Sequence, residues 1–503
     1  MANREQWGSR VGFILAAVGS AIGLGNIWRF PYMAAQNGGG AFFIPYLFAL
    51  FTAGIPIMIL EFGLGHKYRG SAPLTFAKLN RKWEWLGWWQ VIVCFFITVY
   101  YVAVIGWSLS YTVFSLSLSW GEASADFFFN KYLNITDGPF NFGGLQWHIL
   151  IPILIAYLIN FAALYGGVKN GIEKAGKIMM PILFFMTVII AIRGVTLPGA
   201  AAGLNYLFKP DLSKILDYRV WTAAYGQIFF TLSVGFAIMI AYSSYLPKKS
   251  DIVNNAFMTS FLNCGFSLLA GFAVFGIIGH MAKVQGAPVA EVAGNGGVGL
   301  AFVTFPNAIN TLGSVAPIFG VLFFLSLTFA GLTSFISINE AAISSIMDKL
   351  NMERKKVVIA YNVVAFIVSL LFATGAGLYV LDILDHFINS FGIVFGGLIE
   401  VILLGWFFNL KSIQDHVNPI SELRAGGWWI VTIKIITPIV LTYMAVMNLY
   451  GDLTKPYGDY PLNALFAFGW LAIIIVIAGG FYLGSRKWKN ELVLNNNETS
   501  MEG

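Results

Sequence analysis

The stretch GSAIGLGN at residues 19–26 interrupts the first of a series of long apolar segments with three glycines and two small polar side chains. Glycine weakens a helix, and non-helical backbone at membrane depth persists only where it faces protein or a wet cavity. A second stretch, TLSVGF at 231–236, repeats the pattern five helices later. Two such breaks indicate an inverted-repeat transporter with its site near the bilayer midplane. Close helix packing through small residues is the alternative interpretation.

The composition of the whole chain is that of a helical membrane protein. Of its 503 residues 58% are hydrophobic and 11% are charged, and the mean hydropathy is +0.74. A soluble domain of this length carries roughly twice that charged fraction. The apolar runs are long enough to cross a hydrocarbon core about 30 Å thick, and they must be helices because lipid offers backbone groups no hydrogen-bond partner.

We therefore predict an all-α polytopic membrane protein with about twelve crossings and one transmembrane domain over 1–503. The predicted crossings are 11–34, 41–65, 87–117, 149–166, 174–194, 219–245, 253–282, 317–347, 355–373, 378–408, 428–450 and 461–484. A first repeat would cover about 11–194, a second about 219–408, and two further helices about 428–484.

The net charge of +6 follows from Lys and Arg in loops on one side of the predicted bundle, as the positive-inside rule describes. We expect both termini in the cytoplasm and a multi-pass position in a bacterial cytoplasmic membrane, with lipid around the chain and no nucleic-acid partner. Cys94 and Cys264 lie in apolar segments without a paired spacing, which disfavours a disulfide or a metal cluster. The sequence shows no nucleophile–base set, so we do not expect an enzyme.

Three stretches in order along the chain resemble one family. GSAIGLGNIWRFPY at 19–32, GQIFFTLSVGF at 226–236 and FAGLTSFISI at 329–338 are similar to the first-, sixth- and eighth-helix signatures of the neurotransmitter:sodium symporter family. The resemblance covers roughly 4–484. It implies the leucine-transporter fold, in which helices 1–5 and 6–10 form inverted repeats, helices 1 and 6 are unwound at mid-membrane, and two Na⁺ ions accompany the substrate.

The resemblance implies oxygen ligands for both sodium ions. The first site maps onto Ala21, Asn26, Thr231 and Asn263, and the second onto Gly19, Ile22, Ala330, Thr333 and Ser334. The last three of these are spaced i, i+3 and i+4, which places them on one helix face independently of the resemblance. Back-bonding of the two hydroxyls to their own helix is the alternative for Thr333 and Ser334.

The chain also carries a set of polar residues that resembles the chloride site of chloride-dependent members of the family. The set consists of Tyr46, Gln227, Thr231, Asn263 and Ser267. Ser267 stands where chloride-independent bacterial members carry a carboxylate. Two sodium ions beside a neutral zwitterion leave buried positive charge that needs a counter-ion. We expect Cl⁻ to supply it, with an ordinary packing serine and charge balance elsewhere as the alternative.

The resemblance maps a substrate pocket onto both breaks and two further helices. Its predicted residues are Ala21, Leu24, Gly25, Ile97, Tyr101, Phe230, Thr231, Ser233, Phe236, Ser334 and Ile338. Amine-transporting relatives carry an Asp where this chain has Gly23, which favours an amino acid over a monoamine. Bulky apolar walls favour a neutral side chain, and apolar pockets distinguish neighbours by only about 1–3 kcal/mol per methylene.

Two gates and two buried carboxylates complete the predicted machinery. By resemblance, Arg29 and Asp385 form an outer gate, and Arg4, Asp348, Trp7, Ser244 and Tyr245 form an inner one. Glu61 and Glu400 lie inside apolar segments, where carboxylates mark function by default. We expect them to serve structure or to share a proton, with Glu61 against the unwound parts of helices 1 and 6.

These observations predict a sodium-coupled, chloride-dependent symporter that imports a neutral, hydrophobic L-amino acid by alternating access. A transporter of another small zwitterion, a proton-coupled permease, and a substrate-gated channel or nutrient receptor on the same scaffold are the alternatives. The sequence leaves open whether the protein forms a homodimer in the membrane.

Overall fold

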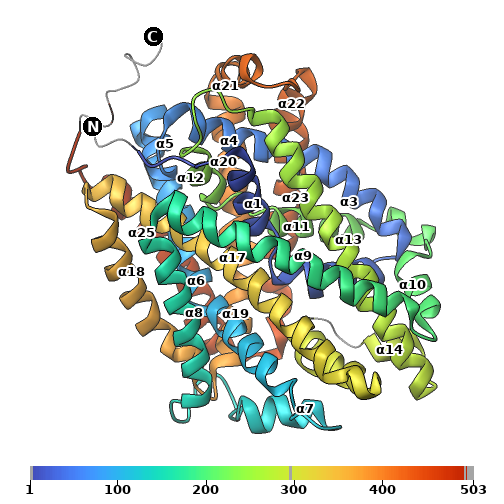
Figure 1. Ribbon diagram of the computed structural model, residues 1–503. Helices are drawn as coiled ribbons and strands as arrows, with labels where there is room; N and C mark the ends of the chain where they lie inside the picture. The colour runs from blue at the N-terminus through green and yellow to red at the C-terminus, as the bar shows by residue number, and fades with distance from the viewer. Residues whose placement is uncertain (1–3, 294–296, 492–493, 495–503) are drawn as a thin grey trace.

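Figure 1 shows a computed structural model of the protein, a bundle of long helices that describes residues 4–293, 297–491 and 494. Ten helical spans in this part of the chain are long and apolar enough to cross a membrane, and a bent pair, Arg10–Ala21 and Gly25–Gln36, adds an eleventh. The twelfth position is filled by α11 (Tyr218–Thr231) and α12 (Ile238–Ser243), which the non-helical segment 232–237 separates.

The predicted all-α polytopic fold is confirmed by these spans. They are Gly40–Tyr68, Arg81–Phe114, Trp147–Tyr165, Val168–Thr196, Ile252–Gln285, Gly313–Leu350, Arg354–Ala373, Gly377–Phe407, Gly427–Asp459 and Leu462–Ser485. The main helices within them are α4 (Ile55–Tyr68), α6 (Glu84–Phe114), α8 (Trp147–Tyr165), α9 (Glu173–Thr196), α13 (Ile252–Gln285), α17 (Ala316–Leu350), α18 (Arg354–Ser369), α19 (Gly377–Phe387), α20 (Val394–Ile402), α23 (Thr437–Thr454) and α25 (Leu471–Ser485). Each span overlaps one predicted crossing over most of its length.

The first predicted break lies between α1 (Arg10–Ala21) and the helical stretch that resumes at Gly25. The Ser9 hydroxyl accepts the Gly12 N–H at 3.0 Å and caps the start of α1. At Ile22 the backbone turns extended, with φ −76° and ψ 95°. The helix axis bends by 56° between the two halves.

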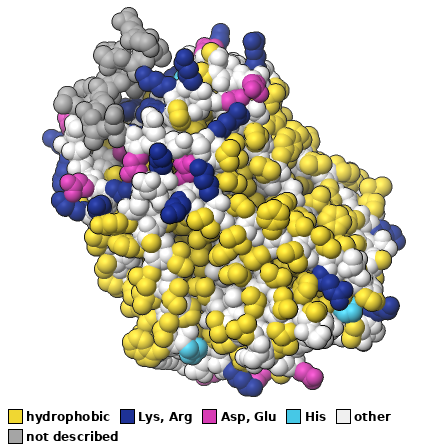
Figure 2. All heavy atoms as spheres, in the orientation of Figure 1, with side chains coloured by type: hydrophobic (Ala, Val, Ile, Leu, Met, Phe, Trp, Pro, Cys, Tyr) yellow, Lys and Arg dark blue, Asp and Glu magenta, His cyan; other side chains and the backbone are white. Residues whose placement is uncertain are grey.

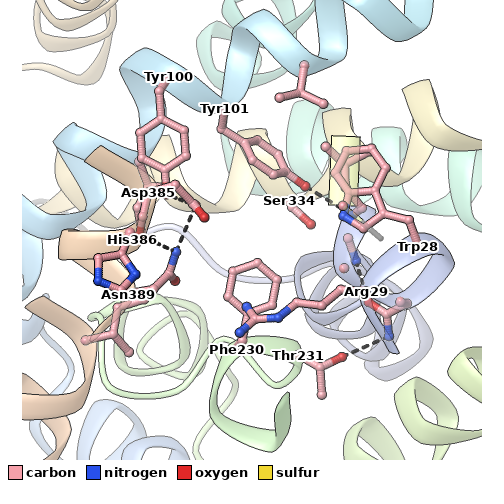
Figure 3. Close-up of a pocket in the computed structure, with 18 of the residues that line it drawn as sticks. Trp28, Arg29, Tyr100, Tyr101, Phe230, Thr231, Ser334, Asp385, His386 and Asn389 are labelled. Carbon is pink, nitrogen blue, oxygen red and sulfur yellow. Dashed lines mark hydrogen bonds between the residues drawn. The ribbon is translucent and has the colours of Figure 1, made fainter. Parts of the chain in front are cut away.

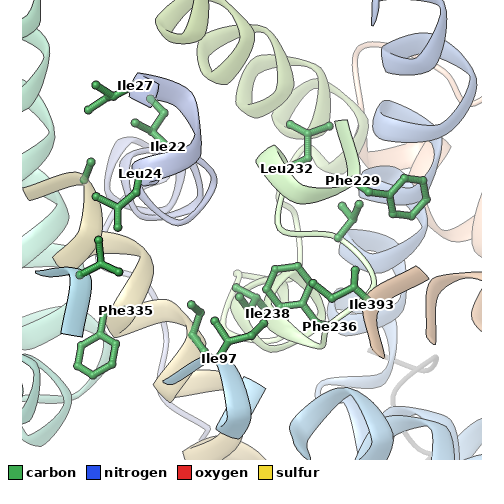
Figure 4. Close-up of a cluster of buried hydrophobic side chains, with 14 of the residues drawn as sticks. Ile22, Leu24, Ile27, Ile97, Phe229, Leu232, Phe236, Ile238, Phe335 and Ile393 are labelled. Atoms are coloured by element: carbon green, nitrogen blue, oxygen red, sulfur yellow. The ribbon is translucent and has the colours of Figure 1, made fainter. Parts of the chain in front are cut away.

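The second predicted break contains three residues in the left-handed region of backbone conformation. Ser233, Gly235 and Ala237 have φ values of 54°, 86° and 69°. Two of them carry a Cβ, so surrounding packing must hold the segment in this costly conformation. Figure 4 shows the packing: apolar side chains from both breaks, including the buried Leu24 and Leu232, lie among Ile97 and other residues of neighbouring helices.

An apolar band covers the middle of the molecule between two charged ends (Figure 2). The two ends of the described chain pack at the same end of the bundle, where the Trp7 N–H donates to the Tyr245 carbonyl at 3.1 Å and the Lys489 N–H donates to the Lys349 carbonyl at 3.2 Å. We call this the Trp7 end. Such a band is expected where lipid covers the protein.

Candidate transport site

A cavity of about 400 Å³ lies between the two helix breaks. It continues to the second half of α19 and to Tyr457, away from the Trp7 end. All of the predicted substrate residues line it: Ala21, Leu24, Gly25, Ile97, Tyr101, Phe230, Thr231, Ser233, Phe236, Ser334 and Ile338. The breaks, α6 and α17 thus bring together side chains that lie up to a few hundred positions apart in the chain.

The first break presents backbone N–H groups to this cavity. The Leu24 N–H donates to the Tyr101 hydroxyl at 3.3 Å, and Figure 3 shows Tyr101 and Ser334 directed at the same region. A Cβ at Gly23 would lie 3.0 Å from the Ser334 hydroxyl oxygen and 3.1 Å from that of Tyr101. A Cβ at Gly25 would lie 2.5 Å from the Phe230 ring. Glycine at both positions therefore keeps this part of the cavity open.

Oxygen atoms of the first predicted sodium site face one another. The amide oxygen of Asn263 lies 3.1 Å from the Ala21 carbonyl oxygen and 3.3 Å from the Thr231 carbonyl oxygen. Turning the amide would let its NH₂ donate to both carbonyls instead. In the first orientation three oxygen atoms converge, the ligand type that a hard cation takes, and the Asn26 NH₂ also donates to the Asn263 oxygen at 2.8 Å. These residues fit sodium.

Asn26 is brought to this site with its amide turned. Its NH₂ donates to the Thr231 hydroxyl at 2.9 Å, to Asn263 at 2.8 Å and to the Ser267 hydroxyl at 2.8 Å. Its oxygen accepts the Gly23 N–H at 2.9 Å. The amide must rotate before this oxygen can face the other ligands.

The second predicted sodium site is assembled between the first break and α17. The Ser334 hydroxyl lies 3.4 Å from each of the Gly19 and Ile22 carbonyl oxygens and 3.0 Å from that of Ser20. The Thr333 hydroxyl, in contrast, donates within α17, to the carbonyls of Phe329 at 3.0 Å and Ala330 at 3.1 Å. Back-bonding, the alternative for these hydroxyls, is therefore present at Thr333, while Ser334 reaches across to the break.

The predicted chloride residues include a buried amide without a partner. Both the oxygen and the nitrogen of the Gln227 side chain are buried and make no hydrogen bond within the described structure. Ser267 donates to the Asn263 carbonyl at 3.2 Å, and the Tyr46 hydroxyl donates to the Cys264 sulfur at 3.3 Å. Buried amides are rarely left unpaired, so Gln227 has a donor free for a bound anion.

The inner gate residues form one closed network at the Trp7 end. The Arg4 guanidinium lies 3.0 Å from the Asp348 carboxylate, donates to the Ser244 hydroxyl at 3.1 Å and covers the Tyr245 ring at 4.9 Å. The Trp7 indole donates to the Tyr242 carbonyl at 2.8 Å. Together these contacts tie the start of the chain to the end of α12 and to α17.

The outer gate residues both line the cavity but do not touch. The Arg29 guanidinium lies 4.6 Å from the Phe230 ring centroid, and no ion pair joins it to a carboxylate within the described residues. Asp385 accepts hydrogen bonds from Tyr100 and Asn389 instead. The structure is thus closed at the Trp7 end and open between Arg29 and Asp385.

The two buried carboxylates lie close enough to interact, and one of them bonds to the second break. Glu61 accepts the Gly235 N–H at 2.6 Å and so holds one of the left-handed residues. Glu400 accepts a hydrogen bond from Gln90 at 2.6 Å. One oxygen of each carboxylate is buried without a partner in the described structure. Glu61 bonds to the unwound segment 232–237, whereas no hydrogen bond joins its carboxylate to the first break within the described residues.

Sequence reasoning missed a second ionic network at the Trp7 end. Arg354 makes two hydrogen bonds to Glu340, at 2.6 Å and 2.7 Å, and one to Glu5 at 2.7 Å, while Tyr245 also donates to Glu340. Glu340 is fully buried. The signal was present, because Glu340 is a carboxylate within an apolar segment, like Glu61.

The chain is similar to known proteins over most of its length. A family model described as the sodium:neurotransmitter symporter family matches residues 4–125 and 119–483. A protein of Methanocaldococcus jannaschii described as an uncharacterized sodium-dependent transporter is 47% identical over 94% of this chain and 96% of its own length. The human sodium- and chloride-dependent GABA transporter 2 is 32% identical over 93% of this chain and 84% of its own. A sodium-dependent dopamine transporter of Caenorhabditis elegans is 28% identical, over 95% and 86%.

Proposed function

The chain belongs to the sodium:neurotransmitter symporter family, and from this premise we propose that it imports a neutral L-amino acid with two sodium ions and chloride. As a member it is a sodium-dependent transporter rather than an enzyme. The observation that carries the proposal is that every predicted substrate residue lines one cavity between the two helix breaks. Backbone N–H groups at one helix half favour an anion, and carbonyls at the end of another favour a cation, which suits a zwitterion.

The amino-acid class of the substrate rests on Gly23 and on the cavity walls. A monoamine needs a carboxylate near its ammonium group, and the first break at 19–26 carries no Asp or Glu, while Asp382 and Asp385 line the cavity on α19. The relatives' names cover both classes, since one is a GABA transporter and another a dopamine transporter. Ile97, Phe236 and Ile338 line the cavity with apolar surface and favour a neutral, hydrophobic side chain.

The chloride requirement rests on Gln227 and Ser267. Ser267 is fully buried one helical turn from Asn263, and a carboxylate at this position would repel an anion. The unpartnered Gln227 amide supports the same assignment. A human relative is named as chloride-dependent, which agrees with the proposal for this chain.

We place the protein in a cytoplasmic membrane with the Trp7 end inside. The many Lys and Arg side chains at that end support this orientation (Figure 2). We infer an outward-open state, which the pairing of Arg4 with Asp348 and the separation of Arg29 from Asp385 support. A homodimer remains an arrangement that the membrane would permit.

Uptake into reconstituted vesicles tests the proposal. The common amino acids are screened with an inward sodium gradient, with and without chloride, and the sodium taken up per substrate molecule is counted. We expect strict coupling and saturable uptake of an aliphatic amino acid. Sodium flux without substrate would indicate a channel, and binding without flux would indicate a nutrient receptor. Uptake driven by protons in the absence of sodium would overturn the proposal.

A further inference from the structure

The carboxylate of Asp385 is anchored on one side only. Its Oδ1 atom accepts the Tyr100 hydroxyl at 2.7 Å and the Asn389 amide at 2.8 Å, as the dashed lines in Figure 3 show. The same Asn389 amide donates to the Asp385 main-chain carbonyl at 2.8 Å, which fixes it one turn further along. The Oδ2 atom accepts no hydrogen bond from a described residue, and it is not buried. Because Asp385 lines the cavity, this oxygen is free to accept a further donor there.

The partner charge is held elsewhere in the same cavity. Arg29 lies over the Phe230 ring at 4.6 Å, and both residues line the cavity (Figure 3). A cation over an aromatic face is a weaker contact than a hydrogen-bonded pair with a carboxylate. Arg29 can therefore leave Phe230 for Asp385 without losing a strong interaction.

We propose that Tyr100 and Asn389 are positioning residues of the outer gate, which hold the Asp385 carboxylate fixed so that Arg29 can close onto its free oxygen. The inference rests on the proposed function, in which closure of this gate follows substrate binding. Neither residue needs to contact the substrate in this role.

The energetic reason is the rotational freedom of the carboxylate. A free Asp side chain must give up rotamer freedom when it pairs, and this loss offsets part of the gain from the ion pair. Two hydrogen bonds to Oδ1 remove that freedom before Arg29 arrives. The two consecutive tyrosines contact different elements, because neighbouring residues on α6 point about 100° away from each other. Tyr101 contacts Leu24, and Tyr100 contacts Asp385.

The test measures closure of the gate directly. A Ser390→Cys reporter at the cavity wall is modified by a charged methanethiosulfonate in sodium buffer, with and without the neutral amino acid that binds most tightly in the uptake screen. In the otherwise unchanged protein we expect the amino acid to slow modification. Tyr100→Phe, which removes one hydroxyl, should weaken this protection by about tenfold, the usual worth of a hydrogen bond to a charged group. Asn389→Leu should act in the same direction.

A double-mutant cycle separates positioning from a general structural role. If Tyr100 acts through Asp385, Tyr100→Phe should have no further effect once Asp385→Asn is present. Tyr157→Phe is the matched control, since it removes an equally buried hydroxyl that bonds to Ser369 at 2.8 Å, outside the cavity. Normal protection in Tyr100→Phe, or an equal loss in the Asp385→Asn background, would overturn the inference. Sodium-driven uptake by the unchanged protein tests the proposed function separately, so the two failures are distinguishable.

Discussion

At the scale of single residues, the charge balance of the proposed site depends on Ser267. It lies one turn after Asn263 on α13, accepts a hydrogen bond from Asn26 and is fully buried. Two sodium ions and a zwitterion bring a net positive charge into a region of low dielectric, where an uncompensated charge is costly. A serine hydroxyl can donate to an anion but carries no charge itself, so in the proposed site a bound chloride supplies the compensation.

Replacing this serine by a carboxylate should therefore remove the requirement for chloride. We expect uptake by the unchanged protein to fall by more than about tenfold when gluconate replaces chloride, because a lost counter-charge costs several kcal/mol. Uptake by Ser267→Glu should be nearly equal in both anions. Ser267→Ala is the control and should still need chloride. Equal rates in chloride and gluconate for the unchanged protein would contradict the assignment.

The sequence located the residues of the site better than it located their hydrogen bonds. The predicted cavity-lining set rests on the resemblance to the family, whereas local composition predicts only the two breaks. The acceptor of the Thr333 hydroxyl could not be chosen from the sequence, because donation within its own helix and donation to another segment differ only by a side-chain rotation. The contacts of Tyr100 and Asn389 with Asp385 could not be predicted either, because they depend on how α19 packs against α6. Glu340 could have been found by the rule that identified Glu61.

At the scale of helices, small residues set how closely neighbours approach. A Cβ at Gly65 of α4 would lie 2.0 Å from the Ile240 carbonyl oxygen and 2.1 Å from the Ser243 hydroxyl oxygen of α12. Both contacts fall on the helix half that follows the second break. Membrane helices gain much of their association from such close packing, since lipid and side chains are equally apolar.

Gly65→Ala should accordingly separate α4 from α12. We expect the free energy of unfolding to drop by about 2 kcal/mol or more, as overpacking against backbone allows no side-chain rearrangement. Gly265→Ala on α13 is the matched control, because a Cβ there has nothing within 4 Å. It should be neutral or stabilise by up to about 1 kcal/mol through helix propensity. Thermal unfolding of the detergent-solubilised variants measures both; equal transitions would refute the packing argument.

A histidine pair links the last turn of α4 to α21 (Lys411–Val417), which lies between two spans. His66 donates to the Pro247 carbonyl through Nε2 at 2.8 Å, so its Nδ1 accepts from Nε2 of His416 at 2.9 Å. Burial, with His66 and Lys67 nearby, lowers the pKa of His416 to about 4.

This link should make stability depend on acidity. The pKa of His416 is lower in the folded than in the unfolded chain, so its contribution is complete above the unfolded value of about 6.5 and is lost as pH falls toward 4. We expect the unfolding temperature to decrease over this window, and His416→Gln to flatten that part of the curve. An unchanged slope in the variant would show that other groups cause it.

At the scale of the whole molecule, the two ends of the cavity are held by different contacts. The Trp7 end is closed by Arg4 and its partners, whereas Arg29 and Asp385 stand apart at the other. Each sodium ion that enters through 100 mV releases about 2.3 kcal/mol, and a tenfold gradient adds about 1.4. Two ions supply roughly 7 kcal/mol, enough for about five decades of accumulation. The gates must be weaker than this to open thermally.

Arg4→Ala should shift the population toward the state that is open at the Trp7 end. The change removes the pair with Asp348 and the bond to Ser244, and a loss of about 1–2 kcal/mol moves a two-state ratio roughly 5- to 30-fold. Single-molecule distances between dyes on the first and eighth helices measure the shift. Lys356→Ala, which removes an exposed pair with Glu353, is the control. Identical distance distributions in Arg4→Ala and the control would argue against the gate.

The closure at the Trp7 end consists entirely of non-covalent contacts, and this has a consequence for the direction of transport. Arg4 pairs with Asp348 and parts from it without a chemical change, so every step of the proposed cycle can run backward. Nothing in these contacts prefers inward over outward movement. The same molecule should exchange labelled for unlabelled substrate at zero net flux, and it should empty a vesicle when the sodium gradient is inverted. Its vectorial behaviour would then belong to the membrane and its gradients, while the protein supplies only the coupling.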